Sequence, residues 1–135
     1  MAELDVGRIW SLNYQLLMSV ITGVAPDLAA LGLEVKELFL LAEVDRHPHP
    51  ARLAEVLSMP KPTVTFYLKR LEAAGFVSRE IDPADLRRHR LIVTPSGRKT
   101  MARGLAMLSK AFGARLAQLS PTQQAQFASL LEKLG

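Results

Sequence analysis

The sequence contains no cysteine among its 135 residues. This absence excludes disulfide bonds, thiolate ligands for a metal, cysteine nucleophiles and sensing by thiol oxidation. The chain also lacks a basic, apolar leader, since it begins MAELDVGRIW, and its apolar runs are far shorter than a membrane span. We therefore expect a cytoplasmic protein that does not associate with a membrane.

Motifs that carry catalysis are missing as well. The sequence has no glycine-rich phosphate loop, no His-x-x-Glu-His pair and no nucleophile elbow. His47 and His49 lie close together in a proline-bounded loop, but no third ligand accompanies them, so we interpret them as loop residues rather than a metal site. The sequence thus predicts no enzymatic activity and no cofactor.

The chain is rich enough in apolar residues, at 49%, to form a core, and its length suits one domain. Its positive charge is concentrated in one segment. Residues 61–103 hold ten Lys or Arg against four Asp or Glu, whereas residues 1–60 hold four against eight. Such a local excess, in a chain of net charge +4, is typical of a nucleic-acid-binding surface rather than of diffuse solubilising charge.

Apolar spacing predicts three helices before this segment. The first has one apolar face and should end before Pro26. The residues of that face are Ile9, Leu12, Leu16, Val20 and Val24. Residues 35–44 predict a second helix that is apolar on most sides and therefore buried, and residues 51–59 predict a third.

Two helices are predicted after the segment. A long one should begin at Pro95, and its apolar residues follow a near-heptad spacing. Ser120, Pro121 and Gln123 combine an N-cap, a proline at the first helical position and a capping box, which predicts the start of the last helix. The apolar residues of this helix, which we expect to face inward, are Phe127, Leu130, Leu131 and Leu134. The outer helices carry more apolar surface than a chain of this size can readily bury, which favours a homodimer.

The elements from residue 61 to 94 follow the order of a winged helix-turn-helix. A helix over residues 62–74 ends at Gly75, and its inward residues are Val64, Leu68 and Leu71. Strands over residues 76–81 and 91–93 enclose a cationic turn that begins with Asp82 and Pro83. Such a helix fits a DNA major groove, and the hairpin tip beside it would hold arginines against the backbone.

The outward face of the helix over residues 62–74 and the hairpin supply the candidate DNA contacts. They are Pro62, Thr63, Thr65, Phe66, Lys69 and Arg70 on the helix, and Asp85, Arg87, Arg88 and Arg90 on the hairpin. Other roles remain open for several of them. Thr63 and Thr65 equally suit a helix N-terminal cap. Lys69 and Arg70 could instead pair with Glu72 or Glu80, which are outside the candidate set. Phe66 either contacts a thymine methyl or packs beside the wing.

Two stretches resemble the MarR family of bacterial transcriptional regulators. PTVTFYLKRLEAAGFVSRE is similar to the family's recognition helix and first wing strand. DPADLRRHRLIVTPSG resembles its wing signature, an Asp-Pro-x-Asp-x-Arg opening with Leu-Thr-x-x-Gly near its close, and this is the specific part of the likeness. Ser58 and Pro60 depart from the family, which commonly has glycine and serine there, so the usual hydroxyl cap is missing.

The resemblance covers nearly the whole chain in element order and implies a single domain of MarR type. Its fold is mainly α with a small β wing. A winged helix-turn-helix over residues 33–94 is flanked by dimerisation helices over residues 1–30 and 95–135. The implied protein is a homodimer that binds a pseudo-palindromic operator in double-stranded DNA, with each recognition helix in the major groove and each wing at the minor groove.

The resemblance also implies roles for single residues and a mode of control. Arg87 is the wing arginine, and Asp85 orients it by a charge-assisted pair. The commoner mode in the family is repression relieved by a small-molecule effector, and the lack of cysteine closes its thiol-oxidation branch. The alternative is a winged helix that docks a protein partner without binding specific DNA, against which the wing arginines argue.

Overall fold

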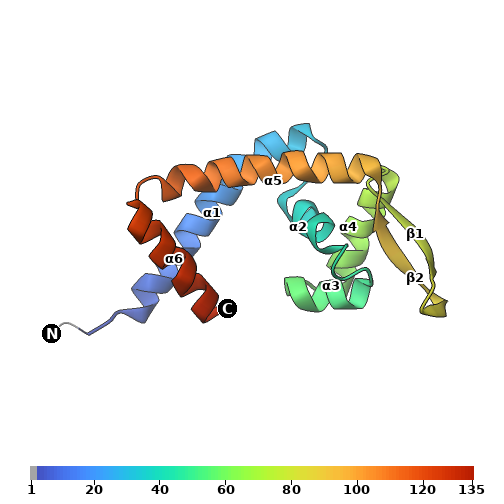
Figure 1. Ribbon diagram of the computed structural model, residues 1–135, viewed down its shortest axis with the longest axis horizontal. Coiled ribbons are helices and arrows are strands. Elements are labelled where there is room, and N and C mark those ends of the chain that lie inside the picture. The colour runs from blue at the N-terminus through green and yellow to red at the C-terminus, as the bar shows by residue number, and fades with distance from the viewer. Residues whose placement is uncertain (1–2) are drawn as a thin grey trace. The chain divides into compact units, whose positions relative to one another are not determined.

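The computed structural model of the chain describes residues 3–135, so Met1 and Ala2, where the predicted N-terminal dimerisation region begins, lie outside it. The elements in order are α1 (Val6–Ala30), α2 (Val35–Glu43), α3 (Pro50–Leu57), α4 (Lys61–Ala73), β1 (Val77–Asp82), β2 (Asp85–Val93), α5 (Pro95–Leu116) and α6 (Pro121–Leu134) (Figure 1). This order confirms the predicted mainly α fold with a small β wing. Within the described residues no single helix is long and apolar enough to cross a membrane, and α1 and α2 meet that test only as a bent pair.

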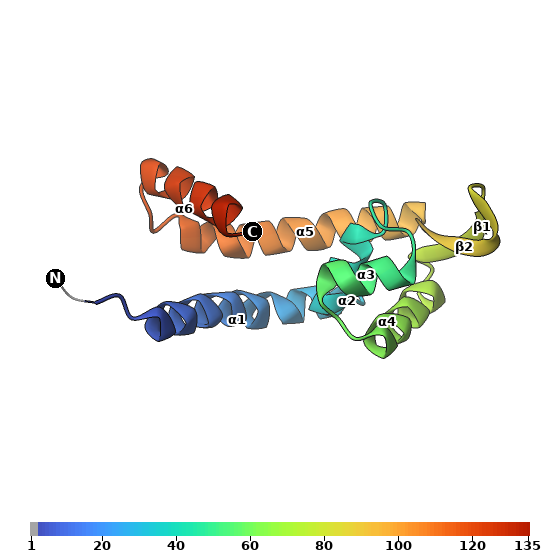
Figure 2. The same ribbon diagram turned by 90° about the horizontal axis from the view of Figure 1, so that it is seen from below.

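The chain divides into two compact units. The larger consists of Ala25–Ala106, and the smaller consists of the residues up to Val24 together with Met107–Gly135. The helices α2, α3 and α4 pack on one another within the larger unit, and the hairpin of β1 and β2 follows α4 (Figure 2). All of the candidate DNA contacts therefore belong to the larger unit.

An aliphatic core holds the larger unit together. Its fully buried side chains are Leu28, Leu38, Leu40, Leu41, Val44, Leu53, Val64, Leu68 and Leu71. The base of the wing joins this core, because Val77, Leu91 and Val93 are also buried. Burying such side chains contributes roughly 1.5 to 3 kcal/mol each relative to leaving them in water, which makes apolar packing the main force that positions α4 and the wing.

The helix α1 runs through Pro26 to Ala30, so the predicted end before the proline is wrong. Proline removes one backbone hydrogen bond from a helix interior. The buried side chains Val24 and Leu28 flank it on either side, and their burial offsets the loss. The actual stop is Gly32, whose φ of 81° lies in the left-handed region. Leu33 N donates to Leu28 O and Gly32 N to Ala29 O, which is a Schellman motif.

The same motif ends both helices of the helix-turn-helix, α3 and α4. Gly75 has a φ of 78°, and the predicted stop at this residue is confirmed. Ser58 has a φ of 52° and stands where glycine would be unstrained. Pro60 occupies the N-cap position of α4 and makes no side-chain cap, so the expected loss of a hydroxyl cap is present in the structure.

The base of the wing is bound tightly to the start of α5. Thr94 N donates to Phe76 O at 3.0 Å, and the Thr94 hydroxyl donates to Gly75 O at 2.6 Å. Gly97 N in turn donates to the Thr94 hydroxyl at 3.0 Å. Gly97 lies so close that a Cβ atom on it would stand 2.0 Å from Phe76 O. The end of α4, the wing and α5 are therefore fixed against one another by backbone contacts.

The smaller unit leaves much of its apolar surface exposed. Residues of α1 and α6 line an apolar groove of about 810 Å³, with Trp10 65% exposed and Leu130 58% exposed at its sides. The expectation that the apolar residues of α6 face inward is wrong for Leu130, Leu131 and Leu134, which are exposed in a single chain, whereas Phe127 is half-buried. The predicted capping box is confirmed, since Gln123 N donates to the Ser120 hydroxyl and Ser120 N to Gln123 Oε1.

Candidate nucleic-acid interface

The helix α4 has one buried and one solvent-facing side, as its apolar spacing predicts. Val64, Leu68 and Leu71 are buried on the inner side. The predicted contact residues lie on the rest of the helix, where Thr63 is half-buried and the others are exposed. The exposed ones are Pro62, Thr65, Phe66, Lys69 and Arg70. The structure therefore places the helix candidates together on an accessible surface.

The two threonines of α4 do not cap the helix. The N-cap position is Pro60, so the alternative role of Thr63 and Thr65 as its N-cap is wrong. The Thr65 hydroxyl donates to Lys61 O at 3.0 Å, one turn earlier. This bond restricts the side-chain rotamer of Thr65, which is exposed as a residue.

Arg70 binds the N-terminus of α2 rather than the acids that were considered for it. Its Nη1 donates to Glu34 Oε1 at 2.9 Å, and its Nη2 lies 3.4 Å from Glu37 Oε1. Glu37 is buried, and its carboxylate also accepts from Glu34 N at 2.9 Å. The alternative partners Glu72 and Glu80 are wrong for Arg70. Arg70 therefore holds α4 against α2 in addition to any contact outside the protein.

Tyr67 completes this junction between α4 and α2. The hydroxyl of Tyr67, followed by the guanidinium of Arg70, stabilises the Glu34 carboxylate and lowers its pKa. The same hydrogen bond to Glu34 raises the pKa of Tyr67. Two side chains on one turn of α4 are thus tied to one carboxylate at the start of α2, which fixes the rotation of α4 about its own axis.

Phe66 projects from α4 without entering the core. Its side chain is 57% exposed, and the ring lies 5.3 Å from the Tyr67 ring, centroid to centroid, in an edge arrangement. The Arg70 guanidinium lies 5.8 Å from the Phe66 ring centroid. The partners of the ring are thus side chains of its own helix.

The wing is a tight hairpin with longer strands than the sequence indicated. The pairing begins at Asp82 opposite Asp85, with a bulge between Ile81 and Asp82, and continues to Val77 opposite Val93. The predicted cationic turn is therefore wrong in its extent: Arg87, Arg88 and Arg90 lie on the strand β2 and not in a loop. Arg88 pairs with Asp82 and Arg90 with Glu80, whereas Arg87 pairs with Asp85.

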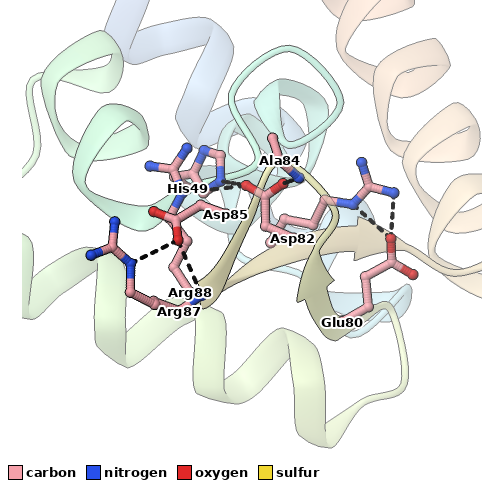
Figure 3. A network of polar contacts seen from close by, with 8 residues as sticks. His49, Glu80, Asp82, Ala84, Asp85, Arg87 and Arg88 are labelled. Atoms are coloured by element: carbon pink, nitrogen blue, oxygen red, sulfur yellow. Dashed lines mark hydrogen bonds and ion pairs between the residues drawn. The ribbon is translucent and has the colours of Figure 1, made fainter.

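A buried carboxylate organises the tip of the wing (Figure 3). Asp82 is 4% exposed and accepts hydrogen bonds from Ala84 N at 2.9 Å and from His49 Nε2 at 2.8 Å. Arg88 Nε lies 3.3 Å from the same carboxylate. The backbone bond from Ala84, followed by the bond from His49 and the charge of Arg88, lowers the pKa of Asp82.

His49 is a residue that sequence reasoning missed. It lies in the loop before α3 and contacts Asp82 across 33 residues of sequence, and no local pattern signals such a pair. Leu91 N donates to Pro48 O at 2.8 Å beside it. These two contacts attach the wing to the loop that precedes the helix-turn-helix. Among residues 3–135 no group of three or more His, Asp or Glu side chains is placed to hold a metal ion.

Arg87 is the most accessible of the wing arginines. Its side chain is 91% exposed, and Asp85 Oδ1 accepts from both its backbone N at 3.1 Å and its Nε at 3.2 Å. The expected pairing of Arg87 with Asp85 is therefore present. Arg90 instead pairs with Glu80, which is its partner across the strands, so its guanidinium is less free to reach a ligand.

Replacing Asp82 by asparagine should make the thermal stability less sensitive to acid. The pKa of Asp82 is lowered in the fold, so its ionised form stabilises the protein. That contribution is fully present above the pKa of an unfolded aspartate, about 4, and is lost as the pH falls through the lower pKa of the folded state. Melting curves followed by circular dichroism between about pH 7 and about pH 3 test this. The parent should melt higher than the variant at neutral pH and lose its advantage in acid, whereas a constant difference would contradict the assignment.

Comparisons with known proteins agree with this geometry. A sequence model of the MarR family matches residues 31–88. The HTH-type transcriptional repressor Rv2887 of Mycobacterium tuberculosis is 32% identical over 114 residues, which cover 83% of this chain and 82% of that protein. The solved complex of that MarR family protein with DNA has a TM-score of 0.79 at 29% identity, and covers 98% of this chain and 99% of the other. Its complex with salicylic acid has a TM-score of 0.78 at 30% identity, with 98% of each chain covered.

Proposed function

Since the chain belongs to the MarR family of transcriptional regulators, we propose that it is a sequence-specific DNA-binding repressor that acts as a homodimer. The observation that carries the proposal is that α4 and the wing belong to the same compact unit. The outward face of α4 is accessible, and the wing beside it presents Arg87 almost fully exposed. A helix with a polar outer face fits a DNA major groove, and a cationic hairpin fits the adjacent backbone or minor groove.

The contacts divide by chemistry. We expect Thr63, Thr65 and Lys69 to reach base edges or phosphates from α4, because Thr65 and Lys69 are exposed and Thr63 is half-buried. We expect Arg87 and Arg88 to bind the backbone or minor groove, with Asp85 and Asp82 beside their guanidinium groups. Pro62 would contact the DNA by shape, because its side chain has no hydrogen-bonding group. Arg70 and Arg90 are paired with Glu34 and Glu80, so they would reach a phosphate only by leaving or sharing these carboxylates.

The homodimer follows from the exposed apolar groove of α1 and α6. Monomeric proteins rarely expose contiguous apolar surfaces, and a second copy of the chain would cover this one. A two-fold dimer binds two half-sites about one helical turn apart, so the operator should be pseudo-palindromic.

We propose further that a small ligand relieves repression. The related repressor Rv2887 has been solved with salicylic acid as well as with DNA, which favours an aromatic acid as the effector class. Such a ligand can act only by binding more tightly to the conformation that does not fit the operator.

The protein would work in the cytoplasm and catalyse no reaction, as a member of a family of transcriptional regulators.

A mobility-shift titration with the DNA upstream of the protein's own gene tests the proposal. We expect a specific shift whose affinity falls at least about tenfold between about 50 mM and about 200 mM salt, because phosphate contacts release counterions. A scrambled duplex of the same length serves as the control. Failure to shift any genomic fragment at the lower salt concentration would favour the alternative, a winged helix that docks a protein.

A further inference from the structure

Phe66 is placed where a DNA-binding helix meets its ligand and yet carries no hydrogen-bonding group. The buried residues Val64, Leu68 and Leu71 define the inner side of α4, and the helical spacing puts Phe66 almost opposite them. More than half of its side chain is in water, at 57% exposure. The neighbouring positions of the outward face hold Thr63, one turn before, and Lys69, one turn after. A large apolar ring therefore lies between Thr63 and Lys69 on the outward face of α4.

The ring is also held in place. The edge contact with Tyr67 and the Arg70 guanidinium 5.8 Å from the ring centroid restrict it from two directions. Arg70 is anchored in turn, since its Nη1 donates to Glu34 Oε1 at the N-terminus of α2. The ordering of an exposed aromatic side chain adds little to the stability of the free protein. The same order lowers the entropy lost when the ring binds a partner.

The chemistry of the major groove identifies that partner. Its base edges consist of hydrogen-bond donors and acceptors, with one apolar group, the C5 methyl of thymine. A phenyl ring would leave donors and acceptors without water and without a partner, whereas it can cover a methyl group favourably. We propose that Phe66 reads a thymine methyl in each half-site of the operator, an inference that rests on the proposed function of DNA binding.

Deoxyuridine tests this directly, because it differs from thymidine only by the missing methyl group. The probe is a duplex that the protein selects from a random pool, resynthesised with one thymine at a time replaced by uracil. One position in each half-site should lose about fourfold in affinity, the factor that corresponds to about 0.8 kcal/mol for one methyl-sized group removed from contact. Replacement at thymines outside the half-sites should change affinity by less than about twofold.

Protein variants assign the effect to Phe66. In Phe66→Ser the thymine and uracil duplexes should bind equally, and in Phe66→Leu part of the preference should remain, because leucine also covers a methyl group. Lys69→Gln is the matched control on the same face: it should weaken both duplexes alike and keep their ratio. Since Phe66 is exposed, the melting temperature of Phe66→Ser should stay close to that of the parent protein. A lost thymine preference could then not be attributed to unfolding.

The outcomes separate this inference from the proposed function. A thymine preference that disappears in Phe66→Ser supports it. If the protein binds the selected duplex but no single uracil weakens binding, or if Phe66→Ser keeps the full preference, Phe66 does not read a methyl group and the proposed function still stands. If no duplex is bound at all, the proposed function fails and the inference fails with it.

Discussion

Replacing Gly97 by alanine should lower the free energy of unfolding by about 3 kcal/mol or more. The added Cβ would stand 2.0 Å from Phe76 O and 2.8 Å from the Phe76 carbonyl carbon, and both atoms belong to the backbone. Neither can move without breaking the bond from Thr94 N to Phe76 O. The expected loss is therefore larger than for an ordinary small-to-large change, and urea or thermal denaturation of the purified protein measures it.

Two other glycines of α5 provide matched controls for the same substitution. At Gly104 a Cβ would lie 2.9 Å from Leu38 Cδ1, which is the end of a flexible side chain, so Gly104→Ala should cost only about 1 kcal/mol. At Gly113 no atom lies within 4 Å, and Gly113→Ala should stabilise the helix by about 0.5 to 1 kcal/mol. If Gly97→Ala unfolded with nearly the same free energy as the parent, the backbone contact between α5 and the wing would be looser than the structure indicates.

Replacing Arg87 by alanine should weaken operator binding by more than about tenfold, because a homodimer loses a charge-assisted contact from each wing. The 91% exposure of Arg87 means that the fold does not depend on it, so the melting temperature should stay within the range of ordinary surface variants. Affinity measured at several salt concentrations adds a second readout. The slope of log affinity against log salt should become shallower by about 0.9 for each phosphate contact removed.

Two further variants show whether the loss belongs to this arginine. Arg115→Ala removes an exposed arginine from the last turn of α5, in the smaller unit, and should leave affinity nearly unchanged. Arg87→Lys keeps the charge but not the planar fork and should recover only part of the binding. Equal affinities of Arg87→Ala and the parent would remove Arg87 from the proposed contacts.

Local patterns were enough to predict the elements that position the interface. The spacing of Val64, Leu68 and Leu71 predicted the buried side of α4, and Gly75 predicted its end, because both signals come from residues within one helix. The pairing of Asp85 with Arg87 came from the resemblance to the MarR family rather than from local spacing, and it is present in the structure.

Long-range contacts explain what the sequence could not predict. Arg70 finds its partners Glu34 and Glu37 on α2, and His49 finds Asp82 on the wing, so each pair depends on how separate elements pack. The predicted helix end before Pro26 was wrong for a similar reason. Its local preference is outweighed by tertiary burial, which cannot be read from a window of neighbouring residues.

Most arginines between positions 61 and 103 lie beside a carboxylate of the same chain. Six of the ten basic residues between positions 61 and 103 are paired with carboxylates. The paired residues are Arg70, Arg79, Arg87, Arg88, Arg90 and Arg98. Because each of these guanidinium groups already has a carboxylate beside it, contact with arbitrary DNA brings less electrostatic gain than the bare count of charges suggests. The protein would therefore spend less of its time on the bulk of the genome, which leaves more of it free to occupy the operator.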